Sequence, residues 1–109
     1  MTLVMALEQE PAGSHASMIG AHLDILVGWT TMANGLLATS ELEAPERQGP
    51  GFALLVFAAE LASALQLEEF APAVAPELRV AATEAIAAAT LAAAGCLAAI
   101  VSDYLVSVA

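Results

Sequence analysis

Residues 14–39, SHASMIGAHLDILVGWTTMANGLLAT, decide the fold class, because their apolar side chains recur at alternating intervals of three and four residues. This interval is that of one face of an α-helix. The clearest row consists of His15, Met18, His22, Ile25, Trp29, Met32 and Leu36, and a flanking row of Ile19, Leu23, Leu26, Ala33 and Leu37 widens it. The pattern predicts one long amphipathic helix that buries more than one seam.

The opposite side of this helix carries small and polar residues, among them Gly28 and Gly35. Each glycine in a helix interior costs roughly 0.8–1 kcal/mol relative to alanine. Close approach of a second helix on this side would offset that cost. A local kink is the alternative explanation for the two glycines.

Three further helices are predicted from the prolines and the apolar spacing. A short N-terminal helix over residues 2–9 stops before Pro11, a third helix covers 52–70, and a long last helix covers 76–106 with Pro76 in its first turn. The third helix would end on acidic residues, where the helix dipole disfavours negative charge. We therefore expect either an early end of that helix or a basic neighbour.

The stretch between the second and third helices, residues 40–51, reads SELEAPERQGPG. Two prolines, two glycines and four charged residues predict a solvated loop there. With 109 residues in all, the chain is long enough for one domain. We predict a single all-α domain over residues 1–109, a bundle of three main helices plus the short N-terminal helix, completed by dimerisation.

The charge balance excludes some classes of function. Twelve acidic residues stand against two basic ones, Arg47 and Arg79, giving a net charge of −10. Nucleic-acid binding needs several basic groups on one surface, so it is excluded, and anionic membrane surfaces are disfavoured for the same reason. A basic protein partner remains compatible with the charge. The alternative is that the acidic residues have no partner and only keep an apolar chain soluble.

The last predicted helix is the most unusual part of the sequence. Residues 85–102 contain no charged side chain, and this length reaches the threshold for a membrane span. More than half of them are alanine or glycine, which favours a helix packed closely against other helices over one inserted in a bilayer. The residues that we predict at a helix–helix interface between copies are Ala85, Ala88, Ala92, Gly95 and Ala99, together with Gly28 and Gly35.

Few residues suggest chemistry. His15 and His22 lie seven residues apart, or about 10.5 Å along a helix, so one metal ion cannot bridge them. A ligand site could combine His22, Trp29 and Glu60, whereas simple packing would leave His22 half-buried with one hydrogen bond and His15 near an exposed helix start. We predict no catalytic residues, no metal and no cofactor, since no catalytic or nucleotide-binding motif occurs.

These observations favour a protein that functions by associating with itself and with other proteins. A signal peptide would begin with a basic region before an apolar run, and this N-terminus has none. Cys96 has no partner cysteine within the chain. We therefore expect a cytoplasmic protein. We expect an accessory, adaptor or regulatory protein that forms a homodimer and contacts other proteins. The alternatives are a small-molecule-binding or enzymatic bundle with an apolar cavity, and a small membrane protein spanning with its C-terminal helix.

Overall fold

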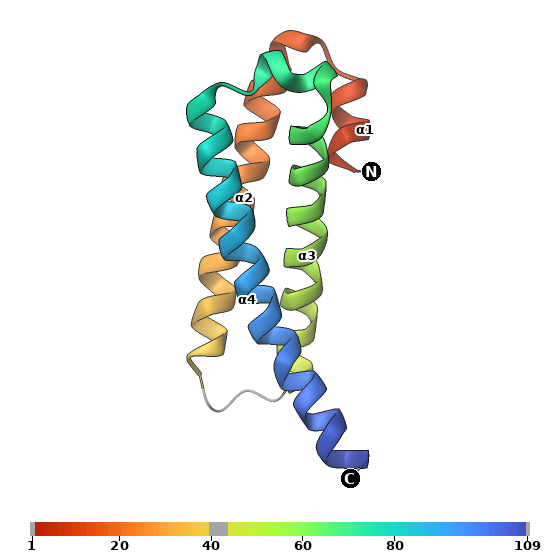
Figure 1. Ribbon diagram of the computed structural model, residues 1–109, viewed down its shortest axis with the longest axis vertical. Coiled ribbons are helices and arrows are strands. Elements are labelled where there is room, and N and C mark those ends of the chain that lie inside the picture. Colours follow the sequence, from red (N-terminus) through yellow and green to blue (C-terminus); the bar gives the residue numbers. More distant parts are fainter. Residues whose placement is uncertain (1, 40–43, 109) are drawn as a thin grey trace.

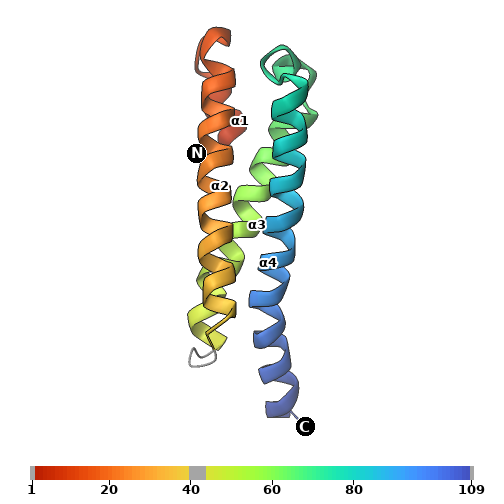
Figure 2. The same ribbon diagram turned by 90° about the vertical axis from the view of Figure 1, so that its left-hand side faces the viewer.

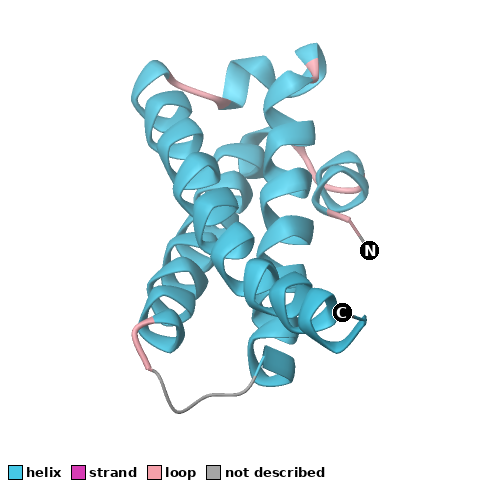
Figure 3. Cartoon of the chain, turned by 60° about the horizontal axis from the view of Figure 1, so that its bottom comes forward, coloured by secondary structure: helices cyan, strands magenta, loops and turns pink. Residues whose placement is uncertain are grey.

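The computed structural model describes residues 2–39 and 44–108, which form helices and the turns between them without a strand (Figure 3). The elements in chain order are α1 (Leu3–Glu8), η1 (Ala12–Ser14), α2 (His15–Leu37), α3 (Ala44–Gln66), η2 (Glu68–Ala73) and α4 (Pro76–Val108). Helices α2, α3 and α4 run alternately down and up the long axis, and α1 lies at the upper end beside α3 (Figure 1). The predicted all-α bundle is therefore confirmed.

The bounds of α1, α2 and α4 agree with the prediction to within two residues. Thr2 caps α1, since its Oγ1 accepts a hydrogen bond from the Met5 backbone N–H at 3.3 Å. This bond satisfies one of the amide groups left free at a helix start. The long last helix ends at Val108 instead of 106.

The buried seam of α2 is not the row that the sequence made clearest. The side chains that it buries are His15, Ile19, Leu23, Leu26, Thr30 and Ala33. In the lower part of the helix this is the flanking row, while Ile25, Trp29 and Met32 of the clearer row are exposed. Both rows are apolar, so spacing alone could not tell which of them faces the other helices and which lies at the edge.

The prediction of a loop over 40–51 is wrong from residue 44 onward, because α3 already begins at Ala44. Residues 40–43 lie outside the described residues. Pro50 lies inside the helix, where its missing N–H leaves the Glu46 carbonyl without the usual partner four residues on. The packing of α3 against the other helices compensates the free-energy cost of this missing hydrogen bond.

Gly51, the last residue of the predicted loop, makes that packing possible. It is buried, and a Cβ built on it would lie 3.0 Å from Cβ of Cys96 and 3.3 Å from Cδ2 of Leu97. The absence of a side chain at Gly51 therefore allows α3 to approach α4 closely. The glycine is a helix-packing residue and not a turn residue.

The third helix ends at Gln66, earlier than the predicted end at residue 70. Leu67 is extended, and Glu68 and Glu69 fall in the first turn of η2 instead of at the end of a helix. The Arg79 guanidinium also donates a hydrogen bond to the Leu65 carbonyl at 3.3 Å, which satisfies a free acceptor at the end of α3. Both expectations raised by the acidic helix end, an early stop and a basic neighbour, are found.

The core lies along the line where the three long helices meet, and small side chains form much of it. Its buried alanines are Ala33, Ala58, Ala64, Ala82, Ala85, Ala89, Ala92 and Ala93. The largest buried side chains are Phe70, Leu7, Ile19, Leu26, Leu54 and Leu61. The result is a slender bundle, 53 Å long and 22 by 17 Å across, with α4 extending past the lower ends of α2 and α3 (Figure 2).

The contact at Gly51 predicts that Gly51→Val destabilises the protein by about 1–3 kcal/mol, because the added methyl groups force α3 and α4 apart. Urea unfolding followed by circular dichroism at 222 nm measures this loss. Gly28→Ala is the matched control, since no atom lies within 4 Å of its built Cβ. It should raise the free energy of unfolding by about 0.5–1 kcal/mol. Equal stability of the two variants would contradict the assigned role of Gly51.

Candidate functional site

Two of the three predicted ligand-binding residues lie together. The rings of His22 and Trp29, on α2, both pack against Phe57 of α3, with centroid distances of 5.1 and 5.0 Å. The His22 Nε2 atom lies 3.1 Å from the Phe57 carbonyl oxygen. A carbonyl only accepts, so Nε2 carries a proton and donates it. His22 is half-buried with this hydrogen bond, which is the arrangement expected from packing alone.

An apolar hollow of about 380 Å³ opens next to this cluster, between the lower parts of α2 and α3. Its lining consists of Trp29, Met32, Gly49, Pro50 and Ala53. No titratable side chain is among them, so the hollow offers apolar contact and no proton-transfer chemistry. It suits an apolar side chain or a small apolar ligand.

Glu60, the third predicted ligand residue, belongs to a different place. It lines a hollow of about 460 Å³ on the α1 side of α3, with Thr2, Val4, Val56, Ala59 and Ser63 as the other lining residues. The structure thus brings His22 and Trp29 together and leaves Glu60 out. Among the residues that the structure describes, no three His, Cys, Asp or Glu side chains are grouped so that they could hold a metal ion.

His15 has a role that the sequence did not indicate. It was expected near an exposed helix start, but it is buried, and its Nε2 lies 2.7 Å from the Leu7 carbonyl and 3.1 Å from the Glu10 carbonyl. Its ring also meets Phe70 of η2 edge-on, at a centroid distance of 5.1 Å. One side chain therefore joins the end of α1, the start of α2 and η2.

The only sequence signal for this contact was the stop of α1 before Pro11. That stop leaves carbonyl groups at the end of the helix without partners, a few residues before the next helix begins. Which side chain donates a hydrogen bond to these carbonyl groups depends on the fold of the chain. The residue spacing within a single helix does not predict it.

The predicted interface residues divide between the inside and the outside of the protomer. Ala85 and Ala92 are buried in the core, and a Cβ built on Gly95 would lie 2.9 Å from Cδ1 of Leu37. These three positions pack against the protomer's own helices. Gly28 and Gly35 are exposed, and nothing lies within 4 Å of their built Cβ positions.

The remaining two interface predictions lie elsewhere on α4. Ala88 is exposed at a small hollow of about 210 Å³ that is also lined by Val27, Thr30, Thr31 and Ala85. The side chain of Ala99 lies outside what the structure describes. Of the predicted interface residues that the structure describes, Ala88 on α4 and the two glycines on α2 are therefore exposed.

Large exposed apolar side chains are a stronger feature than the row of small residues. They occur on each long helix, and examples are Met32 on α2, which is 61% exposed, and Leu91 on α4, which is 75% exposed. Among the side chains that the structure describes, this set comprises Met5, Ile25, Val27, Trp29, Met32, Phe52, Leu55, Val56, Leu67, Val80, Leu91, Tyr104, Leu105, Val106 and Val108. Exposed apolar side chains mark an interaction site where they form a contiguous patch, and these residues are the candidates for one.

The buried contacts of His15 predict that His15→Ala lowers the free energy of unfolding by about 2–3 kcal/mol, because it removes a hydrogen bond, a ring contact and core volume. His22→Ala should cost about 1 kcal/mol, since His22 is only half-buried and bonds a carbonyl within a helix. Chemical denaturation of both variants measures the difference. Equal losses would show that His15 does not join the three elements.

No protein-family model, curated protein or solved structure matches this chain. Its function is therefore inferred from its own surface and contacts, and the feature that stands out among the described residues is their exposed apolar side chains.

Proposed function

We propose that this protein is a small acidic helical accessory or adaptor protein that acts in the cytoplasm by pairing with a second copy and by contacting other proteins. The single observation that carries the proposal is the amount of apolar surface left outside the bundle. Burial of such surface is the main driving force of protein association.

The accessible surface supports the same proposal. The protomer exposes 6419 Å². A compact monomer of 11.0 kDa exposes about 5,600 Å² by the scaling of surface with mass. The excess is on the order of 800 Å², which is the area that one partner buries in a stable interface of standard size. This excess supports the pairing of two copies.

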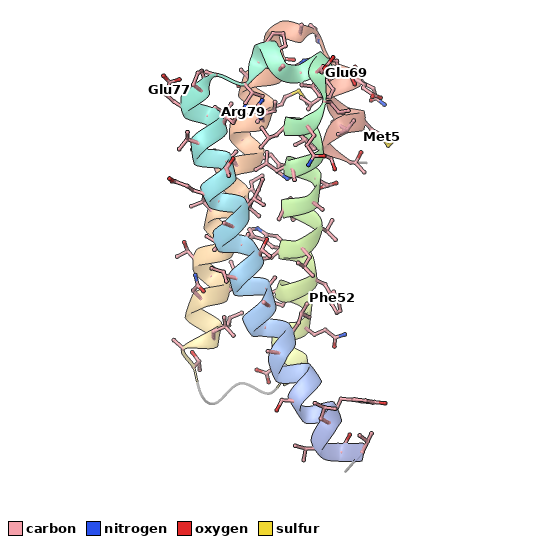
Figure 4. All side chains as sticks on the ribbon, viewed as in Figure 1. Met5, Phe52, Glu69, Glu77 and Arg79 are labelled. Carbon is pink, nitrogen blue, oxygen red and sulfur yellow. The ribbon has the colours of Figure 1, made fainter. Side chains whose placement is uncertain are left out.

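Contacts with a further protein would follow from the acidic upper end. Glu8, Glu10, Glu68, Glu69 and Glu77 are all exposed there, and Figure 4 shows Glu69, Glu77 and Arg79 at this end of the molecule. A surface of this charge steers a basic partner towards it and repels an acidic one. This part of the proposal rests on charge alone and concerns a weaker, salt-dependent contact.

A second candidate function, in a membrane, is favoured by one observation. Two helical segments, Gln48–Gln66 and Pro76–Ala98, are long and apolar enough to cross a bilayer, and only 28% and 33% of an apolar 18-residue stretch within each is buried. They are neighbours in the bundle, so they could insert as a hairpin. Glu60 and Glu84 lie within these segments, and a charged side chain is costly inside a bilayer.

A third candidate is the binding of a small apolar molecule in the hollow beside Trp29. The lining of this hollow by an aromatic ring and Met32 supports it. His22, which packs on the same Phe57 ring as Trp29, already donates its Nε2 proton to a backbone carbonyl. A co-purified ligand in a native mass spectrum would support this candidate.

The proposal predicts a reversible dimer or larger assembly in detergent-free buffer at protein concentrations of about 10 µM, the range of an ordinary homodimer. Sedimentation velocity between about 1 and 100 µM would measure it, with the monomer growing at the dilute end. A chain that stays monomeric throughout this range would refute the proposal. Recovery only with detergent, together with flotation on lipid vesicles, would support the membrane candidate instead.

A further inference from the structure

A hollow of about 450 Å³ lies between the last turns of α3 and the first turns of α4, at the upper end of the bundle (Figure 1). It is distinct from the hollow beside Trp29, which lies between α2 and the lower part of α3. Its volume falls in the range of about 300–1,000 Å³ that is typical of small-molecule sites. The residues that line it are Ala62, Leu65 and Gln66 on α3, and Arg79, Thr83 and Ile86 on α4.

The Arg79 guanidinium is anchored at this hollow by the end of α3 (Figure 4). Its Nη1 donates a hydrogen bond to the Leu65 carbonyl at 3.3 Å, and this carbonyl is the only acceptor that the described residues give to it. A guanidinium has five N–H donors, so most of them remain for water or for a ligand. Because one bond already positions the group, less conformational entropy is lost when a ligand binds to it.

No carboxylate of the described residues is paired with this guanidinium, although the chain has twelve acidic residues and only two basic ones. None of the six lining residues is acidic. Side chains three or four residues apart are neighbours on a helix, and the positions at these intervals from Arg79 carry no acid. They are Ala75, Pro76, Ala82 and Thr83. The positive charge at the hollow is therefore left for an external anion.

The rest of the lining is mainly apolar. Leu65 is buried, and Ile86 is half-buried and packs against the core, so both are held in place beside the hollow. Gln66 adds a carboxamide whose N–H groups can donate to an anion. The Thr83 hydroxyl already donates to the Arg79 carbonyl at 2.8 Å. A ligand that matches this lining has an anionic group at one end and an aliphatic chain beside it.

The charges around the hollow favour a monoanion. A guanidinium binds both carboxylate and phosphate through paired hydrogen bonds. Glu68, Glu69 and Glu77 are exposed at the same end of the molecule, so three negative charges surround the one positive charge of Arg79. Net repulsion grows with the charge of the ligand, which disfavours a phosphate dianion. A carboxylate in contact with the guanidinium keeps the short-range attraction, while solvent screens the exposed glutamates.

We infer that the hollow between the end of α3 and the start of α4 binds a small monocarboxylate with a short aliphatic chain. The carboxylate pairs with the Arg79 guanidinium, and the chain lies on Leu65, Ile86 and Ala62. This site needs no second copy of the chain, so the inference is independent of the proposed self-association.

Octanoate serves as the probe, in a titration of isotope-labelled protein followed by its amide chemical shifts. We expect saturable shifts at residues 62–67 and 76–87, with a dissociation constant below about 1 mM. Octylamine has the same chain with a positive head, and acetate has the carboxylate without the chain. Each should bind at least about tenfold more weakly than octanoate. Octylamine binding as tight as that of octanoate, or no saturation by about 10 mM octanoate, would overturn the inference.

Two matched substitutions test the role of the guanidinium. Arg79→Gln removes the charge at the hollow, and Arg47→Gln removes an equal charge from the first turn of α3, at the opposite end of that helix. We expect Arg79→Gln to raise the octanoate dissociation constant at least about tenfold and Arg47→Gln to change it less than about twofold. Arg79→Lys should raise it about threefold, because lysine keeps the charge and lacks the planar fork. Equal effects of the two glutamine variants would show that only net charge matters and would overturn the site.

Thr83→Leu tests the hollow with Arg79 left in place. The larger apolar side chain occupies part of the space for the aliphatic chain, so we expect it to raise the octanoate dissociation constant at least about fivefold. Circular dichroism checks that each variant is folded, and Thr83→Leu decides the question where Arg79→Gln is not. Unchanged octanoate affinity in folded Thr83→Leu would place the ligand elsewhere and overturn the inference.

Discussion

The close approach of α4 to its two neighbours is the constraint on which the rest of this structure depends. It is made by residues without side chains or with very small ones: Gly51 against Cys96, Gly95 against Leu37, and a seam of alanines along α4. Small side chains bring helix backbones close and so increase the dispersion contacts between them. They also leave little volume between the helices for larger side chains.

The exposed apolar surface follows from this narrow core. A bundle 22 by 17 Å across encloses one row of medium-sized residues from each helix, among them Leu26, Leu54 and Leu61. Further apolar side chains on the same helices have no interior to enter, so Trp29 and Leu91 lie outside. The same packing that stabilises the protomer therefore creates the surface that we assign to association.

The two histidines are explained by structural contacts, although histidine is a residue type that often binds ligands or takes part in catalysis. Both donate Nε2 protons to backbone carbonyls, and both pack against a phenylalanine from another element. His15 acts as a joint between α1, α2 and η2, while His22 joins α2 to α3. Their hydrogen bonds compensate the burial of polar atoms, which is the ordinary requirement for a polar group in a core. Neither needs a ligand to explain its position.

The sequence by itself determined that the chain is all-α, where three of its helices begin and end, and that it carries a net charge of −10. These properties are local or additive: helix periodicity, proline positions and net charge can be read without knowing which segments meet. The tertiary structure alone decided that the flanking row of α2 faces the core, that Gly51 packs α3 on α4, that His15 reaches the carbonyl groups of α1, and that Glu60 lies apart from His22 and Trp29. Each of these depends on contacts between segments distant in the sequence, and in a chain so rich in apolar residues and alanine many helix faces satisfy the same spacing equally well.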